Sequence, residues 1–263
     1  MVRLGGTATT SHMSAFRGIE THFKRQGIDI DWVMYSDDQA VVDAFIAGEI
    51  DLAWNGPLGY VKIKRQAADA CRVIAMRDVD VNFTTHFITQ ANSGIVTVED
   101  LKNRSFAFGR RSSVQAGLLA YSFLKDSGID PRKDLSVNSF YDDRQSQTKS
   151  DERDVVERVS TGEFDAGAVS QMAMESMAED RTLPRDDIRI FWSSPGYSHC
   201  CFTAQSDMEP GVYQEIERAF LSVDSSDPDG KSVLDAEGCS SFVSGIEHGW
   251  EILEKAAIDE GLV

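Results

Sequence analysis

The chain of 263 residues has no long hydrophobic run and no recognisable leader segment. None of its apolar stretches approaches the about 20 residues that a membrane-spanning helix needs. Met1 leads directly into residues 2–6, which have the pattern of a strand and not of a signal peptide. We therefore expect a soluble protein that spans no membrane. We expect it to be cytoplasmic as written, and periplasmic or membrane-tethered if a leader has been removed.

Cysteine is scarce, and its spacing excludes a C-x-x-C metal or redox motif. The four cysteines are Cys71, Cys200, Cys201 and Cys239. Adjacent Cys200 and Cys201 are poorly placed to bond each other, because a vicinal disulfide has unfavourable geometry. This pattern favours a reducing compartment over an oxidising one.

Positive charge is also in short supply. The chain has 26 Lys and Arg residues against 43 Asp and Glu residues, a formal net charge of -17. The resulting field repels polyanions, which excludes nucleic acid and argues against an anionic bilayer as partner. An anionic ligand must therefore be held by local groups.

The alternation of strand and helix patterns predicts an α/β protein. Apolar residues at helical spacing follow strand-like runs along the whole chain, with no internal repeat and no low-complexity linker. We predict two lobes, one made of residues 1–87 and 192–263 and the other of residues 88–191. The crossing segments, near residues 86–90 and 191–194, would form a hinge.

One segment of the sequence closely resembles a known family. Residues 48–57 follow the pattern G-x-[IV]-D-[IL]-A-W-x-G-P of the phosphate, phosphite and phosphonate receptors of ABC transporters. Other matches occur in the same order as in that family, at residues 93–95, 99–101, 106–113, 128–131, 162–169 and 194–195. The resemblance implies the type II periplasmic-binding-protein fold, with a ligand held in a cleft at the hinge.

The loops after the strands are the expected ligand site, because α/β sheets bind ligands beyond the carboxyl ends of their strands. Ser112 and Ser113 precede a helix expected from Val114, so their hydroxyls and the first N–H groups of that helix can hold an oxyanion or simply cap the helix. Arg110 adds positive charge. The predicted ligand-binding residues are Thr10, Trp54, Asn55, Gly56, Phe83, Thr84, His86, Arg110, Ser112, Ser113, Gln115, Glu152, Ser170, Tyr197, His199 and Cys200.

Two of these positions depart from the family pattern. Phosphonate receptors tend to carry Ser-Thr-Ser at the start of the helix, whereas this chain reads Ser113, Val114, Gln115. The family often has a histidine that faces the anion, and an alignment with the family places Glu152 of this chain at that position. A carboxylate beside a dianion is unfavourable by a few kcal/mol. The ligand is therefore expected to be zwitterionic or partly cationic, unless Glu152 points elsewhere.

A third departure is the segment that contains His199, Cys200 and Cys201. Cysteine beside histidine can form a nucleophile or a pair of soft metal ligands. His199, Cys200 and Glu152 are therefore candidate catalytic residues, and His199, Cys200 and Cys201 are candidate metal ligands. The alternative is a buried strand of small residues with a structural role and no catalytic or metal-binding function.

These observations leave three hypotheses. The first is a monomeric receptor that needs no cofactor and passes a small polar solute to an ABC-transporter permease. The second is a cytoplasmic enzyme on the same scaffold that uses the loop at residues 199–201, with iron or zinc. The third is a ligand sensor that docks another protein. Fold alone does not decide among them.

Overall fold

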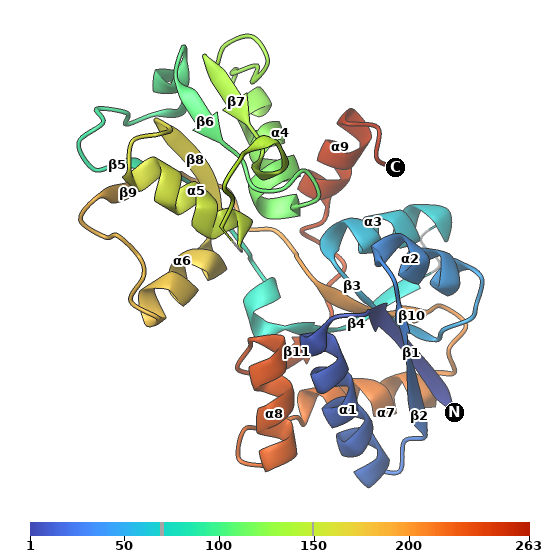
Figure 1. Cartoon of the computed structure of the whole chain (residues 1–263). Helices are drawn as coiled ribbons and strands as arrows, with labels where there is room; N and C mark the ends of the chain where they lie inside the picture. The colour runs from blue at the N-terminus through green and yellow to red at the C-terminus, as the bar shows by residue number, and fades with distance from the viewer. Residues whose placement is uncertain (69–70, 149) are drawn as a thin grey trace. The chain divides into compact units, whose positions relative to one another are not determined.

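The computed structural model describes residues 1–68, 71–148 and 150–263 (Figure 1). These residues divide into two compact units, each treated by itself below. The first unit comprises Met1–Asn82 and Tyr197–Val263, and the second comprises Phe83–Gly196. Strands and helices alternate in both, so the predicted α/β class is confirmed.

The first unit is built on a mixed sheet with the strand order β11-β4-β10-β3-β1-β2. β1 runs parallel to both β2 and β3, while β10 is antiparallel to β3 and β4. β4 therefore runs in the same direction as β1 and β3, and all three end at the same edge of the sheet. The strands are β1 (Val2–Thr7), β2 (Ile30–Tyr35), β3 (Leu52–Asn55), β4 (Cys71–Arg77), β10 (Cys201–Gln205) and β11 (Phe242–Ser244).

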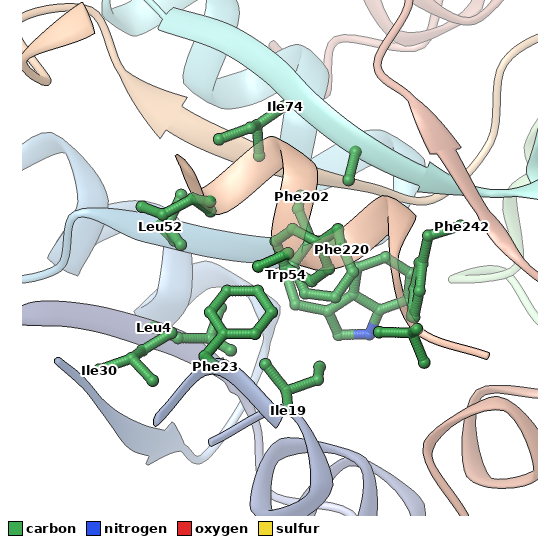
Figure 2. Close-up of a cluster of buried hydrophobic side chains, with 14 of the residues drawn as sticks. Leu4, Ile19, Phe23, Ile30, Leu52, Trp54, Ile74, Phe202, Phe220 and Phe242 are labelled. Atoms are coloured by element: carbon green, nitrogen blue, oxygen red, sulfur yellow. The ribbon is translucent and has the colours of Figure 1, made fainter. Parts of the chain in front are cut away.

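Helices cover both faces of this sheet. One core contains Trp54, Phe202 and Phe220, whose side chains pack against helices α1, α7 and α8 (Figure 2). The opposite core contains Tyr60 and Trp250, with ring centroids 4.2 Å apart, under α2, α3 and α9. The helices are α1 (Thr10–Arg25), α2 (Asp38–Ile46), α3 (Pro57–Gln66), α7 (Pro210–Leu221), α8 (Pro228–Glu237) and α9 (Glu251–Asp259).

The second unit has a smaller mixed sheet with the order β7-β6-β8-β5-β9. β6 is parallel to β7 and β8, so these strands also end at one edge, while β5 is antiparallel to β8 and β9. The strands are β5 (Thr85–Gln90), β6 (Ser105–Ala107), β7 (Val137–Ser139), β8 (Ala166–Ser170) and β9 (Ile188–Ser193).

The faces of the second sheet are covered in the same manner. One core places Val155 and Val159 of α5 and Met177 of α6 against the sheet. On β5 and β6, Phe87 and Phe106 form an edge-to-face pair with ring centroids 5.2 Å apart. The helices are α4 (Leu119–Asp126), α5 (Asp151–Ser160) and α6 (Gln171–Glu179).

The structure differs locally from the sequence-based expectation. The helix expected from Val114 begins as a π-helical segment, η3 (Val114–Leu118), before α4. Helix α6 was not predicted. Strand β11 lies in the C-terminal part of the chain, from residue 207 onward, where the sequence pattern predicted helices. The crossing segments near residues 86–90 and 191–194 overlap β5 and β9, which pair with each other. None of the described helices has both the length and the hydropathy of a membrane span.

Candidate functional site

Each unit gathers its polar candidate residues at the edge where its parallel strands end. In the first unit, β1 ends at Thr7, β3 at Asn55 and β4 at Arg77. Cys201, the first residue of antiparallel β10, pairs with Asn55, so the segment just before Cys201 reaches the same edge. Residues distant in sequence therefore meet beyond the first sheet, at the expected place for ligands in an α/β protein.

Trp54 and His12 form a hydrogen-bonded pair at this edge. The Trp54 indole N–H donates to Nε2 of His12 at 3.1 Å. An indole can only donate, so Nε2 is unprotonated and Nδ1 carries the hydrogen. Nδ1 then donates to the carbonyl of Thr7 at 2.9 Å. The loop after β1 is thus tied to β3, and Trp54 is both a core residue and part of the site edge.

Helix α3 begins at this edge without a side-chain cap. Gly56 is its N-cap residue, Pro57 follows, and no side-chain hydrogen bond caps the described helix. The first N–H groups of a helix have no partner within the helix and carry partial positive charge. The start of α3 is therefore suited to an anionic group.

Arg77 and Asp80 form a buried ion pair beside Trp54. The guanidinium Nε donates to Asp80 Oδ2 at 2.5 Å, and Nη2 donates to Oδ1 at 3.0 Å. Arg77 also lies over the Trp54 ring, 5.3 Å from its centroid. Burial opposes ionisation of Asp80, but hydrogen bonds from His199 and Arg77 outweigh it and hold the pKa of Asp80 below its ordinary value.

His199 and Cys200 join this pair. Nδ1 of His199 lies 3.1 Å from Oδ1 of Asp80 and 3.2 Å from Sγ of Cys200. Burial raises the pKa of the Cys200 thiol well above its ordinary value. A thiol in that state is a poor nucleophile, so the arrangement does not support Cys200 as a catalytic residue.

Cys201 is separated from these groups. Successive side chains of a strand point to opposite faces, and Cys201 lies in the core under α2 and α3 while Cys200 packs against the other core. The Sγ atom of Cys201 is 3.6 Å from Oγ1 of Thr203. Within the described residues, the donor atoms that lie within 4.8 Å of one another are those of Asp80, His199 and Cys200, and Cys201 is not among them.

Glu237, at the end of α8, adds a second buried carboxyl group. Its backbone oxygen accepts a hydrogen bond from Arg77. Burial raises the pKa of Glu237 to about 7, against the opposing effect of Arg77. In the described part of the chain, Oε1 of Glu237 has no hydrogen-bond partner.

In the second unit, Glu152 occupies the donors at the ends of β6 and β8. The backbone N–H and the hydroxyl of Ser170 donate to Oε2 of Glu152 at 2.5 and 2.7 Å. The side-chain amide of Gln115 donates to Oε1 at 2.8 Å. Burial raises the pKa of Glu152, although these hydrogen bonds oppose that effect. The predicted residues Gln115, Glu152 and Ser170 are thus brought together.

Other donors of this edge are also satisfied by carboxylates. The backbone N–H of Arg110 donates to Asp151 at 2.8 Å, and that of Arg111 donates to Asp142 at 2.7 Å. The Arg110 guanidinium lies 4.5 Å from the ring centroid of Tyr141. The backbone donors of this edge are therefore satisfied by carboxylates of the same unit.

The serines before η3 have different roles. Ser113 is its N-cap residue and accepts a hydrogen bond from the N–H of Ala116 at 3.3 Å, as the capping alternative predicted. Ser112 is exposed.

The other predicted residues are placed as follows. The Asn55 amide donates to the Ala53 carbonyl and to Thr203, so it has a structural role. Thr10 is exposed and lines an open groove between α1 and α8. The other placements are Phe83 and Tyr197, which are buried, Thr84, which donates to Gln171, and His86, whose Nδ1 is 2.8 Å from Ser193 Oγ.

The sequence patterns did not predict Arg77, Asp80 and Glu237 as residues of this site. The signal was present in part, because Arg77 ends a strand and acidic residues follow it. Asp80 and His199 are 119 residues apart, however, and no local pattern joins them.

The chain matches known proteins over nearly its whole length. The sequence model of one family, described as ABC transporter, phosphonate, periplasmic substrate-binding protein, matches residues 14–248. The probable ABC transporter phosphite binding protein PhnD1 of Prochlorococcus marinus (strain MIT 9301) is 24% identical over 242 residues, which cover 88% of this chain and 79% of that protein.

Solved structures agree on the fold. PhnD1 of Prochlorococcus marinus in complex with methylphosphonate superposes with a TM-score of 0.73 at 21% identity, covering 100% of this chain and 98% of that one. XAC2383 of Xanthomonas citri bound to chloride gives a TM-score of 0.70 at 17% identity, covering 100% and 99%. The type II periplasmic-binding-protein fold expected from the sequence is confirmed.

These matches decide two of the earlier expectations. The substrate-binding function is supported over the enzyme alternative, because the matched family consists of transporter binding proteins. The cytoplasmic location was wrong, because the matched family is periplasmic. The expected reducing compartment was inferred from cysteine spacing, which carries less weight than a match to residues 14–248.

Proposed function

Because the chain belongs to the family of phosphonate ABC transporter, periplasmic substrate-binding proteins, we propose that it captures a small solute bearing both an anionic and a cationic group. The family implies a small-molecule ligand and a permease partner, and its members generally need no cofactor. The protein with its bound solute would dock on the permease. The working state would be a monomer.

The contrast between the two strand edges supports this ligand class. The start of α3 in the first unit has no side-chain cap in the described chain, which suits a phosphonate or another oxyanion. In the second unit, Glu152 already accepts the hydrogen bonds of Ser170 and Gln115. The single observation that carries the proposal is this carboxylate, placed on donors that an oxyanion would otherwise use.

Electrostatics then favours a cationic group beside Glu152. Two like charges about 4 Å apart repel by about 4 kcal/mol at an effective dielectric constant of about 20. When Glu152 is ionised, a dianion approaching this edge would meet that penalty, whereas an ammonium group would gain a comparable attraction. Aminoalkylphosphonates combine both groups in one small molecule.

A matched pair of ligands tests the proposal by isothermal titration calorimetry. Methylphosphonate carries only the anionic group, and an aminoalkylphosphonate adds the ammonium group. We expect the aminoalkylphosphonate to bind at least about tenfold more tightly, a difference of about 1.4 kcal/mol. The preference should disappear in Glu152→Gln, because the amide keeps the shape of the side chain and removes its charge.

The control is Glu179→Gln, which neutralises an exposed carboxylate in α6 of the same unit. It should retain the preference of the unmodified protein. Equal or tighter binding of methylphosphonate to the unmodified protein would refute the zwitterionic ligand class. Failure of both ligands to bind would refute a phosphonate ligand.

A further inference from the structure

The cluster at residues 77–80 and 199–200 of the first unit has no part in the proposed solute site. Three different donor types converge there: a carboxylate of Asp80, an imidazole nitrogen of His199 and the thiol of Cys200, all within 4.8 Å of one another. The backbone N–H of His199 also donates to the carbonyl of Asp80 at 3.0 Å, so two independent contacts fix the imidazole beside the carboxylate.

The spacing of these donors is close to that of a tetrahedral metal site. Bonds of about 2.0–2.2 Å to nitrogen and oxygen and about 2.3 Å to sulfur separate neighbouring donors by roughly 3.3–3.6 Å. The observed separations are 3.1 Å between His199 Nδ1 and Asp80 Oδ1, and 3.2 Å between His199 Nδ1 and Cys200 Sγ. Side-chain shifts of a few tenths of an ångström would open the cluster enough for an ion.

Arg77 orients the carboxylate without excluding a metal. Its guanidinium donates to both oxygens of Asp80, and a carboxylate has about four lone-pair positions, so acceptor capacity remains. Ligating carboxylates are commonly hydrogen-bonded in this way by outer groups. Arg77 also donates to the backbone oxygen of Glu237, which ties the end of α8 to the cluster.

Glu237 provides the second, independent sign of a ligand. Its side chain is 4% exposed, and in the described residues Oε1 accepts no hydrogen bond. A buried carboxylate oxygen without a partner is costly to maintain. A divalent cation bound at Asp80, His199 and Cys200 would stabilise the ionised form of this carboxyl group through space.

We propose that the first unit binds a divalent transition-metal ion through Asp80, His199 and Cys200. Mixed oxygen, nitrogen and sulfur donors suit zinc, cobalt or ferrous iron and do not suit magnesium or calcium, which take oxygen ligands. On binding, the Cys200 sulfur gives its proton to solvent, and His199 carries its hydrogen on Nε2 instead of Nδ1, which frees the Nδ1 lone pair for the metal. The site does not depend on the identity of the transported solute.

Cobalt titration of the full chain tests the site. The protein is freed of metal by chelation and exchanged into chelator-free buffer, and Co²⁺ is added while absorption is recorded. We expect saturation at equimolar Co²⁺, with a thiolate-to-cobalt charge-transfer band in the near ultraviolet and the visible bands of tetrahedral cobalt. Added Zn²⁺ should displace the cobalt and remove both signals.

Variants identify the ligands. Cys200→Ser should lose the charge-transfer band, and His199→Gln should weaken Co²⁺ binding at least about tenfold. Cys239→Ser is the matched control, because Cys239 packs against the same core as Cys200 but lies outside the donor group. Circular dichroism confirms that each variant is folded.

Two results would overturn the site: unmodified protein that binds no equimolar Co²⁺, or a charge-transfer band that persists in Cys200→Ser. The first result needs no variant, so the test stands even where a substitution impairs folding. Calorimetry with the phosphonate ligands is recorded on the metal-free protein. The result for the metal site and the result for the solute site are therefore independent.

Discussion

The two units differ in the polar groups that they place at the edge where their parallel strands end. In the first unit, the strand edge presents an uncapped helix start at α3, an imidazole and a guanidinium. In the second, carboxylates of Asp142, Asp151 and Glu152 accept the N–H groups of the corresponding loops. A common fold thus sets where a ligand is held, and a few acidic side chains set which charge it needs there.

The units are alike, however, in how they support these edges. Each buries an aspartate against an arginine: Asp80 with Arg77 in the first unit, and Asp154 with Arg144 at 2.8 Å in the second. Asp154 also pairs with Arg158 at 2.9 Å. The supporting pairs are therefore comparable even though the ligand-facing groups are not.

Removal of these aspartates is expected to produce the largest effect. Asp80→Ala and Asp154→Ala each leave a buried guanidinium without its counter-charge, which should lower the free energy of unfolding by about 3–5 kcal/mol. Urea denaturation in the presence of a chelator measures the loss. A small effect in one unit and a large effect in the other would show that only one of the two buried ion pairs stabilises its unit.

The control for this pair is Asp235→Ala. Asp235 forms an exposed ion pair with Lys231 in α8, and such pairs contribute about 0–1 kcal/mol. If Asp154→Ala costs no more than Asp235→Ala, then the buried pair of the second unit is not a support.

Glycine at the two edges should give the next largest effect. A Cβ atom at Gly117 would lie 2.2 Å from the carbonyl oxygen of Arg110, whereas one at Gly56 meets no atom within 4 Å. Gly117→Ala should therefore destabilise the second unit by about 1–3 kcal/mol, because the backbone must shift to relieve the clash. Gly56→Ala serves as the control: it meets no atom, so it should lower the urea midpoint less than Gly117→Ala does, through the weaker N-cap preference of alanine alone.

Local sequence patterns predicted the parts of this comparison that depend on local chemistry. The serine cap before η3 follows from a residue type with a strong capping preference. The face of Cys201 was also open to prediction, because strand side chains alternate. Those elements needed no knowledge of distant residues.

The missed features depend on contacts between distant segments. His199 meets Asp80 across 119 residues, and Arg77 reaches the backbone of Glu237 across 160. Helix α6 was missed because it buries only Met177 fully, which leaves a weak apolar pattern. The π-helical start of η3 reflects close packing of Gly117 on Arg110, which sequence periodicity does not encode.

The pH dependence of stability tests the buried carboxyl group of Glu152 at the edge of the second unit. Burial raises its pKa above the ordinary value of 4.5, against hydrogen bonds from Ser170 and Gln115. Folding therefore favours the protonated form: the contribution to stability is fully present below the unfolded pKa and is lost as pH rises through the folded pKa. The unmodified protein should lose stability relative to Glu152→Gln as pH rises from about 4.5.

Urea midpoints of both proteins across this range give the difference. Other buried carboxyl groups, including Glu237, contribute equally to both curves and cancel in the subtraction. Glu179→Gln should track the unmodified protein, because Glu179 is exposed. A constant difference between the unmodified protein and Glu152→Gln at all pH values would show that Glu152 keeps its ordinary pKa.

The smallest expected effects concern the two helix starts. Ser113→Ala removes the side-chain cap of η3 and should cost about 1 kcal/mol of stability. Gly56→Ser does the reverse at α3, where a serine hydroxyl would cap the helix and add a few tenths of a kcal/mol. Because the same N–H groups are proposed to hold the anionic end of the solute, this gain in stability should coincide with weaker binding of the aminoalkylphosphonate. Calorimetry and urea denaturation on one preparation measure both changes, and unchanged affinity in a more stable Gly56→Ser would place the anion away from α3.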